Sequence, residues 1–256
     1  KNINFKKKKT ADWFSDLRDQ ICGMLESFET SKRNASKFKK VLWRRNPESH
    51  DDQGGGEISL LRGNIFEKAG VNISTVYGKF DKKFQQHIPG AEIDPKFWAS
   101  GISVVIHPLS PLIPTIHMNT RFIVTSKYWF GGGADLTPTY KESPDSKKIA
   151  KQFHKDLKKI CESYDTGCYS KYKKWCDEYF FLPHRQETRG LGGIFYDYLN
   201  SDDWNNDFKF TQSVGTTFLK SYKKIVKSTI NQKWTKKDKN MQLFRRSRYV
   251  EFNLLF

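Results

Sequence analysis

The sequence has few cysteines and no long apolar run, and both shortages exclude whole classes of protein. No stretch of about 18 apolar residues occurs, which argues against a membrane-spanning helix, and the chain start lacks the apolar stretch of a secretory signal. The four cysteines show neither C-x-x-C spacing nor the density of a disulfide scaffold. We therefore expect a soluble protein of a reducing compartment, with free thiols and no cysteine zinc site.

Several cofactor-binding and catalytic motifs are also missing. The glycines at 131–133 are not followed by Lys-Ser or Lys-Thr at the spacing of a phosphate-binding loop. Neither a dinucleotide-binding fingerprint nor an H-E-x-x-H pair occurs, and we find no internal repeat. The sequence therefore offers no standard site for a nucleotide or for the zinc ion of a metalloprotease.

What is present is a strongly basic composition with enough apolar residues for one core. The 256 residues are 37% hydrophobic and 15% aromatic, which suits a single domain over 1–256. The net charge of +17 could serve nucleic acid, anionic lipid or an acidic small molecule. Lysine dominates the runs at 6–9, 147–159 and 171–174, which we interpret as solvated surfaces.

Arginine is distributed differently from lysine. Seven of the 11 arginines lie in strongly patterned segments, namely Arg62, Arg121, Arg185, Arg189, Arg245, Arg246 and Arg248. The planar guanidinium binds carboxylates through two parallel hydrogen bonds, so this distribution suggests an anionic ligand that carries carboxylates. Pairing with surface Asp and Glu is an equally good interpretation at this point.

The apolar periodicity predicts an N-terminal helix, then a group of strands, and then mainly helices. Trp13, Leu17, Ile21 and Leu25 recur at the period of an amphipathic helix, which predicts a helix over 11–28. Further helices are expected over 149–160, 172–181 and 214–230, and a mobile loop over 46–56. Strands are expected over 38–45, 58–61, 64–68 and 71–77. Two more are expected on both sides of the prolines within 101–124, and a third in this region ends at Trp129 and Phe130. The last strands are expected over 190–198 and 248–256. Without regular βαβ alternation, this order favours an antiparallel α+β fold.

The glycine triplet at 131–133 lies directly before Ala134 and Asp135. A flexible glycine turn would let the backbone approach a ligand and would present Asp135 beside it. The same triplet could instead be a plain hairpin turn.

Four of the six histidines could meet in one pocket. His107 and His117 flank the proline-rich connection and converge if their strands pair, His154 lies on a predicted helix, and His184 follows a helix end. Such side chains could bind a divalent metal, act as acids or bases, or be ordinary hydrogen-bonded groups. The spacing matches no structural zinc module.

Two short segments are rich in arginine. The segments 184–189 and 245–248 could both clamp carboxylates of a ligand. Alternatively, Glu187, Glu251 and neighbouring acids neutralise these cations within the protein.

Taken together, five segments resemble the oxygen-dependent coproporphyrinogen oxidases, and the similarity runs in order from about Trp43 to Phe256. The segments are GGGEISLLRGNIFEKAGVNISTVYG, SVVIHPLSPLIPTIHMNTRF, WFGGGADLTPTY, KKWCDEYFFLPHRQETRGLGGIFYD and RRSRYVEFNLL. The resemblance implies a large, mostly antiparallel sheet flanked by helices on both faces. It also implies oxidative decarboxylation of two propionates of coproporphyrinogen III to vinyl groups by molecular oxygen, giving protoporphyrinogen IX in haem biosynthesis.

The same resemblance assigns roles to individual residues. His117 matches the family's proposed proton donor, and Asp135 matches a carboxylate thought to meet the pyrrole NH groups. Ser103, Asn119, Thr120 and Arg121 match substrate-contacting positions, and Arg121 would grip a propionate. His107, His117, His154 and His184 match the histidines of a divalent-metal site in bacterial relatives. No organic cofactor is expected.

The resemblance further implies a homodimer, in the cytoplasm or in the mitochondrial intermembrane space, and we favour the cytoplasm. Family members continue past the position of Phe256 through a Gly-Gly-Arg substrate contact and a dimer-forming strand. We therefore expect the C-terminal part of the family domain to be missing here, which would affect activity and dimerisation. Tyr77 replaces the family's usual His, so no role is transferred to it.

Three other interpretations compete with the oxidase. The high positive charge and the aromatic residues could indicate a nucleic-acid-binding protein, which would bind with a steep dependence on salt. The histidines could indicate a metal-dependent hydrolase. An inactive remnant that serves in protein interactions is the third.

Overall fold

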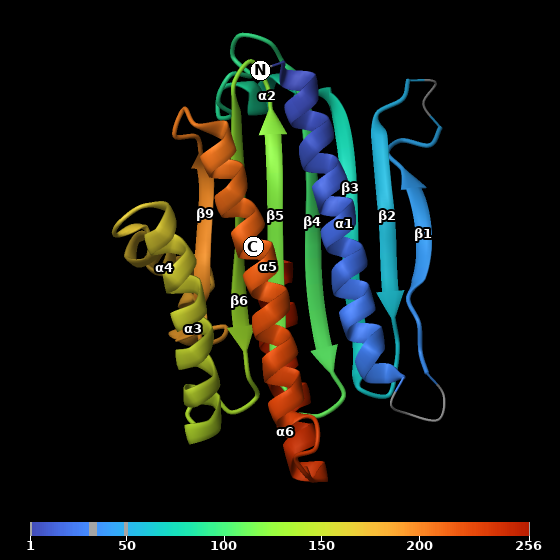
Figure 1. Cartoon of the computed structure of the whole chain (residues 1–256), viewed down its shortest axis with the longest axis vertical. Helices are drawn as coiled ribbons and strands as arrows, with labels where there is room; N and C mark the ends of the chain where they lie inside the picture. Colours follow the sequence, from blue (N-terminus) through green and yellow to red (C-terminus); the bar gives the residue numbers. More distant parts are fainter. Residues whose placement is uncertain (1, 31–34, 49–50, 256) are drawn as a thin grey trace.

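The computed structural model describes residues 2–30, 35–48 and 51–255, which form one seven-stranded sheet with helices on both faces (Figure 1). Every neighbouring pair of strands is antiparallel, and the spatial order is β1-β2-β3-β4-β5-β6-β9. The strands are β1 (Lys39–Arg44), β2 (Gly54–Leu61), β3 (Phe66–Lys79), β4 (Lys96–Pro108), β5 (Thr115–Val124), β6 (Tyr128–Thr137) and β9 (Gly193–Leu199). The prediction of an antiparallel α+β fold is confirmed.

The helices divide the sheet into a covered face and an open face. α1 (Ile3–Glu29), α3 (Pro144–Tyr164) and α5 (Trp204–Thr229) lie on the covered face, which Figure 1 shows from the front. α4 (Cys168–Tyr179) packs on the edge strand β9, and α2 (Lys82–Gln85) belongs to the segment that connects β3 to β4. α6 (Lys236–Leu255) runs along part of the open face, where Tyr249 contacts His107. Among the described residues, none of these helices has the length and apolar character needed to cross a bilayer.

Alternation along the central strands separates the two faces. In β4, Ile102, Val104 and Ile106 are buried against the helices of the covered face, while Ser103 between them is exposed on the open face. β5 repeats this alternation, so that Met118 is buried in the same core. Because successive side chains of a strand point to opposite faces, this pattern predicts which polar residues share the open face.

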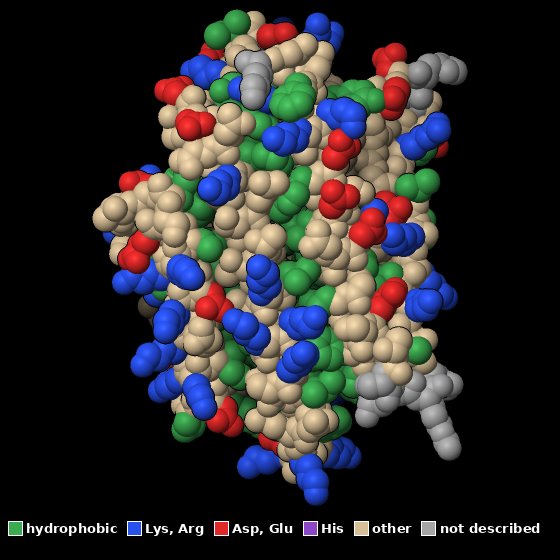
Figure 2. All heavy atoms as spheres, viewed as in Figure 1, with side chains coloured by type: hydrophobic (Ala, Val, Ile, Leu, Met, Phe, Trp, Pro, Cys, Tyr) green, Lys and Arg blue, Asp and Glu red, His purple; other side chains and the backbone are tan. Residues whose placement is uncertain are grey.

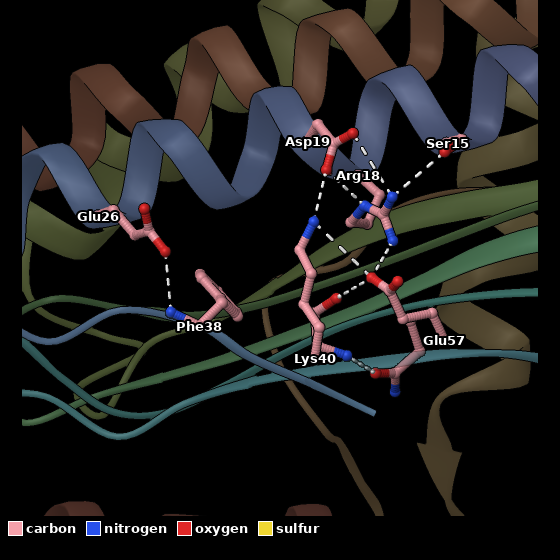
Figure 3. Close-up of polar contacts among 9 residues, drawn as sticks. Ser15, Arg18, Asp19, Glu26, Phe38, Lys40 and Glu57 are labelled. Carbon is pink, nitrogen blue, oxygen red and sulfur yellow. Dashed lines mark hydrogen bonds and ion pairs between the residues drawn. The ribbon is translucent and has the colours of Figure 1, made fainter. Parts of the chain in front are cut away.

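α1 is held on the covered face by charged groups as well as by its apolar side (Figure 3). The buried Arg18 donates a hydrogen bond to Glu57 of β2, and Asp19 accepts one from Lys40 of β1 at 2.9 Å. Glu26 accepts a hydrogen bond at 2.8 Å from the backbone N–H of Phe38. These contacts fix α1 across the first strands of the sheet.

Of the three lysine runs predicted to be solvated, the run at 147–159 lies exposed on the covered face, whereas Lys6 and Lys7 are half-buried over the rings of Tyr128 and Trp98. Figure 2 shows Lys and Arg side chains gathered over α3 and α5. The lysines of the run at 147–159 are all exposed.

The predicted strand over 248–256 is wrong, because its described residues belong to α6. Tyr249 and Phe252 lie three residues apart and are buried together, whereas Val250 is 49% exposed and Leu254 is 79% exposed. This is the spacing of a helix side, which the apolar composition of the segment does not distinguish from a strand. Phe256 lies outside the described residues.

The glycine triplet is also not a turn, since it lies in the middle of β6, which continues to Thr137. A Cβ atom at Gly133 would come within 2.4 Å of the carbonyl oxygen of Ile194 in β9. The triplet therefore permits close approach of neighbouring groups rather than a reversal of the chain. The expected strands over 64–68 and 71–77 are one strand, β3, and the loop over 46–56 is shorter because β2 begins at Gly54.

Candidate active site

The pairing of β4, β5 and β6 brings five of the predicted site residues to the open face. His117 pairs with Asp135 across β5 and β6, and Asn119 pairs with Ser103 across β4 and β5. Arg121 lies two positions after Asn119 in β5, so the alternation of the strand places it on the same face. Its ion-pair partner Asp197 lies on that face as well, together with Phe195. The alternation of the strands, which is readable in the sequence, therefore places these residues together.

His117 and Asp135 form a hydrogen-bonded pair. The Nδ1 atom of His117 lies 2.8 Å from Oδ1 of Asp135, and Asp135 is 3% exposed at its side chain. A carboxylate accepts hydrogen bonds only, so Nδ1 carries the proton. The other ring nitrogen, Nε2, then carries a lone pair and can accept a proton, and the histidine side chain is 16% exposed.

Arg189 completes this pair from the opposite side of the carboxylate. Its Nη2 atom lies 2.7 Å from Oδ2 of Asp135, and its side chain is 2% exposed. Burial on its own would raise the pKa of Asp135. The Arg189 charge and the hydrogen bond to His117 outweigh that effect, so the pKa lies below its usual value and Asp135 is a carboxylate at neutral pH.

The guanidinium of Arg189 lies among aromatic rings that come from two separate elements. Its Cζ is 3.8 Å from the ring centroid of Phe180, which ends α4, and 4.3 Å from that of Tyr249 in α6. Phe252 is at 5.1 Å. The segment 184–189 suggested a clamp for ligand carboxylates, but this arginine binds a carboxylate of the protein itself.

Arg121 lies further along the open face and is also paired. Its Nη2 atom donates to Oδ2 of Asp197 in β9 at 2.6 Å, and its side chain is 30% exposed. Gly131 gives this pair its space, because a Cβ there would lie 2.4 Å from Oδ1 of Asp197 and 3.0 Å from Nε of Arg121. The sequence interpretation missed Asp197. The signal was available, since alternation after Ile194 and Tyr196 places Asp197 on the open face.

Thr120 is not on the open face. Its side chain is 1% exposed on the covered face, between Ile102 and Gly132 in the ladder. The reason is the two-residue period of β5, which separates Thr120 from its neighbours Asn119 and Arg121. Only its backbone can contribute to a site that uses these neighbours.

The structure does not bring the four histidines together. Nε2 of His154 lies 2.8 Å from the carbonyl oxygen of Leu191 and its Nδ1 lies 2.9 Å from the Tyr169 hydroxyl, while His184 contacts Glu251 at 2.8 Å. His107 packs edge-on against Tyr249, and burial lowers its pKa to about 4, so it is neutral at pH 7.

Each histidine thus has different direct partners. Within residues 2–30, 35–48 and 51–255, no three His, Cys, Asp or Glu side chains form a group that could hold a metal ion. The expected four-histidine site is not assembled in this chain.

Three other arginines of the two arginine-rich segments form ion pairs within the protein. Arg185 forms two hydrogen bonds to Glu251, at 2.7 and 2.8 Å, and Arg245 contacts Glu187 at 3.0 Å. Arg248 contacts Glu187 at 3.3 Å. These pairs join α6 to the short segment with β7 (Phe181–Leu182), η1 (Pro183–Arg185) and β8 (Glu187–Thr188). The interpretation as internal ion pairs is confirmed for these three residues.

The open face therefore combines a histidine that can accept a proton with an arginine that can bind an anion. His117 lies next to a surface that carries Ser103, Asn119 and Arg121. The glycines of β6 have no side chains, so a ligand can approach the backbone of the sheet there. Such an arrangement suits a flat, apolar ligand with carboxylates at its rim.

Comparison with known proteins agrees with this geometry. Residues 9–256 match the family model described as coproporphyrinogen III oxidase. The oxygen-dependent coproporphyrinogen-III oxidase of Rickettsia bellii (strain OSU 85-389) is 52% identical over 247 residues, which cover 96% of this chain and 87% of the relative. The enzyme of the same name from Rickettsia akari (strain Hartford) is 52% identical over 255 residues, covering 98% and 88%. These relatives support neither the nucleic-acid-binding nor the hydrolase interpretation, and the chain belongs to the coproporphyrinogen III oxidase family.

Proposed function

We propose that this chain catalyses the oxygen-dependent oxidative decarboxylation of two propionates of coproporphyrinogen III to vinyl groups, giving protoporphyrinogen IX in haem biosynthesis. The observation that carries this proposal is the match of residues 9–256 to the family, with relatives named for this reaction that are 52% identical. The nucleic-acid-binding, hydrolase and inactive-remnant interpretations lack a comparable observation.

The open face supports binding of such a substrate. Coproporphyrinogen is an apolar macrocycle with carboxylates at its rim, so it requires a low, uncharged floor and a cation beside it. Gly101, Gly131 and Gly133 provide the floor, Arg121 provides the cation, and Ser103 and Asn119 provide hydrogen bonds. Because Arg121 already bonds to Asp197 through Nη2, its orientation is set before a propionate arrives.

The chemistry requires little beyond orientation and control of protons. Each step turns –CH2–CH2–COO⁻ into –CH=CH2 and CO2, and releases one proton and two electrons, which molecular oxygen accepts. His117 is proposed as the group that moves a proton at Nε2, and Asp135 as the carboxylate that orients it through Nδ1. The electron-rich substrate supplies the reducing power.

Three further properties are part of the proposal and are inferred from the resemblance. The enzyme works as a homodimer, it needs no organic cofactor, and it acts in the cytoplasm. Molecular mass in solution, activity of the purified chain without added cofactor, and cell fractionation test these properties separately.

The experiment that tests the function is aerobic conversion of coproporphyrinogen III by the purified chain, measured as protoporphyrin fluorescence after oxidation. Asp135→Ala and an anaerobic sample are the controls. We expect product that depends on oxygen and is lost in Asp135→Ala. No product from a folded wild-type chain would contradict the proposal.

A further inference from the structure

Arg189 has no role in the reaction described so far, although it is buried and bonds to Asp135, the carboxylate that contacts His117. We propose that Arg189 is a positioning residue for the reaction above, acting through Asp135 to hold His117 with its proton on Nδ1 and with Nε2 toward the open face. This inference rests on the proposed function, and it goes beyond it because it assigns a role to a residue that does not touch the substrate.

The geometry gives Asp135 two different partners, one on each oxygen. Oδ1 accepts from His117 and Oδ2 accepts from Arg189, at 2.8 and 2.7 Å. The plane of the carboxylate is therefore fixed from both ends, which fixes the ring of His117 in turn. A carboxylate that orients a histidine in this way also selects its tautomer.

Arg189 is itself held tightly, so it can act as a rigid support. The rings of Phe180 and Tyr249 lie within 4.3 Å of its Cζ, and its side chain is 2% exposed. A planar guanidinium stacks on aromatic rings and points one N–H at the carboxylate, whereas a flexible ammonium group lacks this plane. Charge and shape of the residue thus both serve the position of Asp135.

The consequence of losing this cation follows from the burial of Asp135. A buried carboxylate without a positive partner takes up a proton. A protonated Asp135 can donate to Nδ1 of His117, which forces the histidine proton onto Nε2. The nitrogen that faces the substrate would then be a donor instead of an acceptor, while Arg121, Ser103 and Asn119 would still bind substrate.

The decisive variant is Arg189→Met, which removes the charge and keeps an apolar side chain among the rings. We expect kcat to fall by about 10- to 100-fold, at the lower end of what general acid–base catalysis contributes, with KM within about twofold of wild type. Two-bond ¹H–¹⁵N correlation spectra of ¹⁵N-histidine-labelled protein report the tautomer of His117 directly. The wild type should show the Nδ1–H form, and Arg189→Met should show the Nε2–H form or a mixture.

Two further variants separate positioning from plain stability. Arg189→Lys keeps the charge but not the planar shape, so it should keep the Nδ1–H tautomer and give a kcat between those of wild type and Arg189→Met. Arg189→Gln keeps a donor without the charge and should behave like Arg189→Met, which also serves if Arg189→Met does not fold. Arg18→Met removes another buried arginine, from the covered face, and should leave kcat and the His117 tautomer unchanged.

The inference is overturned if folded Arg189→Met or Arg189→Gln retains the wild-type tautomer and kcat. It is also overturned if KM rises while kcat is unchanged, because Arg189 would then contact substrate. The tautomer measurement needs no substrate, so it tests the link from Arg189 to His117 even where the wild-type chain forms no protoporphyrin.

Discussion

The two faces of the sheet each bury an arginine against a carboxylate, but the two pairs are connected to different groups. On the covered face, Arg18 bonds to Glu57 and to Asp19, and Asp19 continues to Lys40 at the protein surface (Figure 3). On the open face, Arg189 bonds to Asp135, and the chain of contacts ends at Nε2 of His117.

This difference shows what each pair stabilises. The Arg18 pair connects α1 with β2 and is complete within the protein, so its removal should affect folding alone. The Arg189 pair connects a side chain to a group that meets the substrate, so its removal should affect the reaction first. A buried ion pair is weak evidence for stability in itself, and its partners decide its role.

The largest effect should come from Asp135→Asn, which breaks the open-face pair at its centre. An amide can donate to Nδ1 of His117 and reverse its tautomer, so we expect kcat to fall by about 100- to 10,000-fold. Steady-state kinetics with circular dichroism as a folding control provide the measurement. Activity within tenfold of wild type would show that the pair is not needed.

Arg18→Met should have the next largest effect, on stability only. Removing Arg18 leaves Glu57 with the more distant cation of Lys40, at 3.7 Å, and because the Glu57 side chain is 19% exposed we expect a loss of about 1–3 kcal/mol. Urea unfolding measures the loss, and kcat should be unchanged. A fall in kcat at full stability would remove the contrast between the faces.

A smaller effect is expected from filling the floor of the open face. In Gly131→Ala the new methyl group would displace the Arg121–Asp197 pair, and we expect KM to rise by about tenfold, equivalent to about 1.4 kcal/mol. Gly70→Ala is the matched control, because the nearest described atom to its Cβ belongs to the Asn72 side chain, at the ordinary contact distance of 3.8 Å. Equal KM values for the two variants would argue against a role of Arg121 in binding.

The smallest effect concerns the attachment of α6 and depends on pH. Burial alone would raise the pKa of Glu67, but hydrogen bonds from Arg246 and Lys239 lower it from 4.5 to about 2. Because this pKa is depressed in the folded state, the contribution is complete above pH 4.5 and is lost as pH falls toward 2.

We therefore expect Glu67→Gln to be less stable than wild type by up to about 1 kcal/mol at pH 7, with the difference shrinking between pH 4.5 and 2. Thermal unfolding across this range is the measurement. A difference that grows as the pH falls would contradict the assigned direction.

Much of the fold could be predicted because short segments of the sequence indicate strands and which of their residues share a face. The runs on both sides of the prolines within 101–124 correctly predicted two strands, β4 and β5, and the alternation along them places Ser103 and His117 on one face. α6 could not be predicted, because Tyr249, Val250 and Phe252 suit a strand by composition and become helical only where Tyr249 and Phe252 pack on Arg189 and Phe180.

The sequence by itself determined the family, through its ordered segments, and placed His117, Asn119 and Arg121 on one face through the period of β5. Only the tertiary structure decided that Arg189 pairs with Asp135, that Arg121 pairs with Asp197, and that the four histidines stay apart. The physical reason is that local periodicity assigns a side chain to a face, whereas the pairing of charges 54 or 76 residues apart depends on how the sheet and α6 close around them.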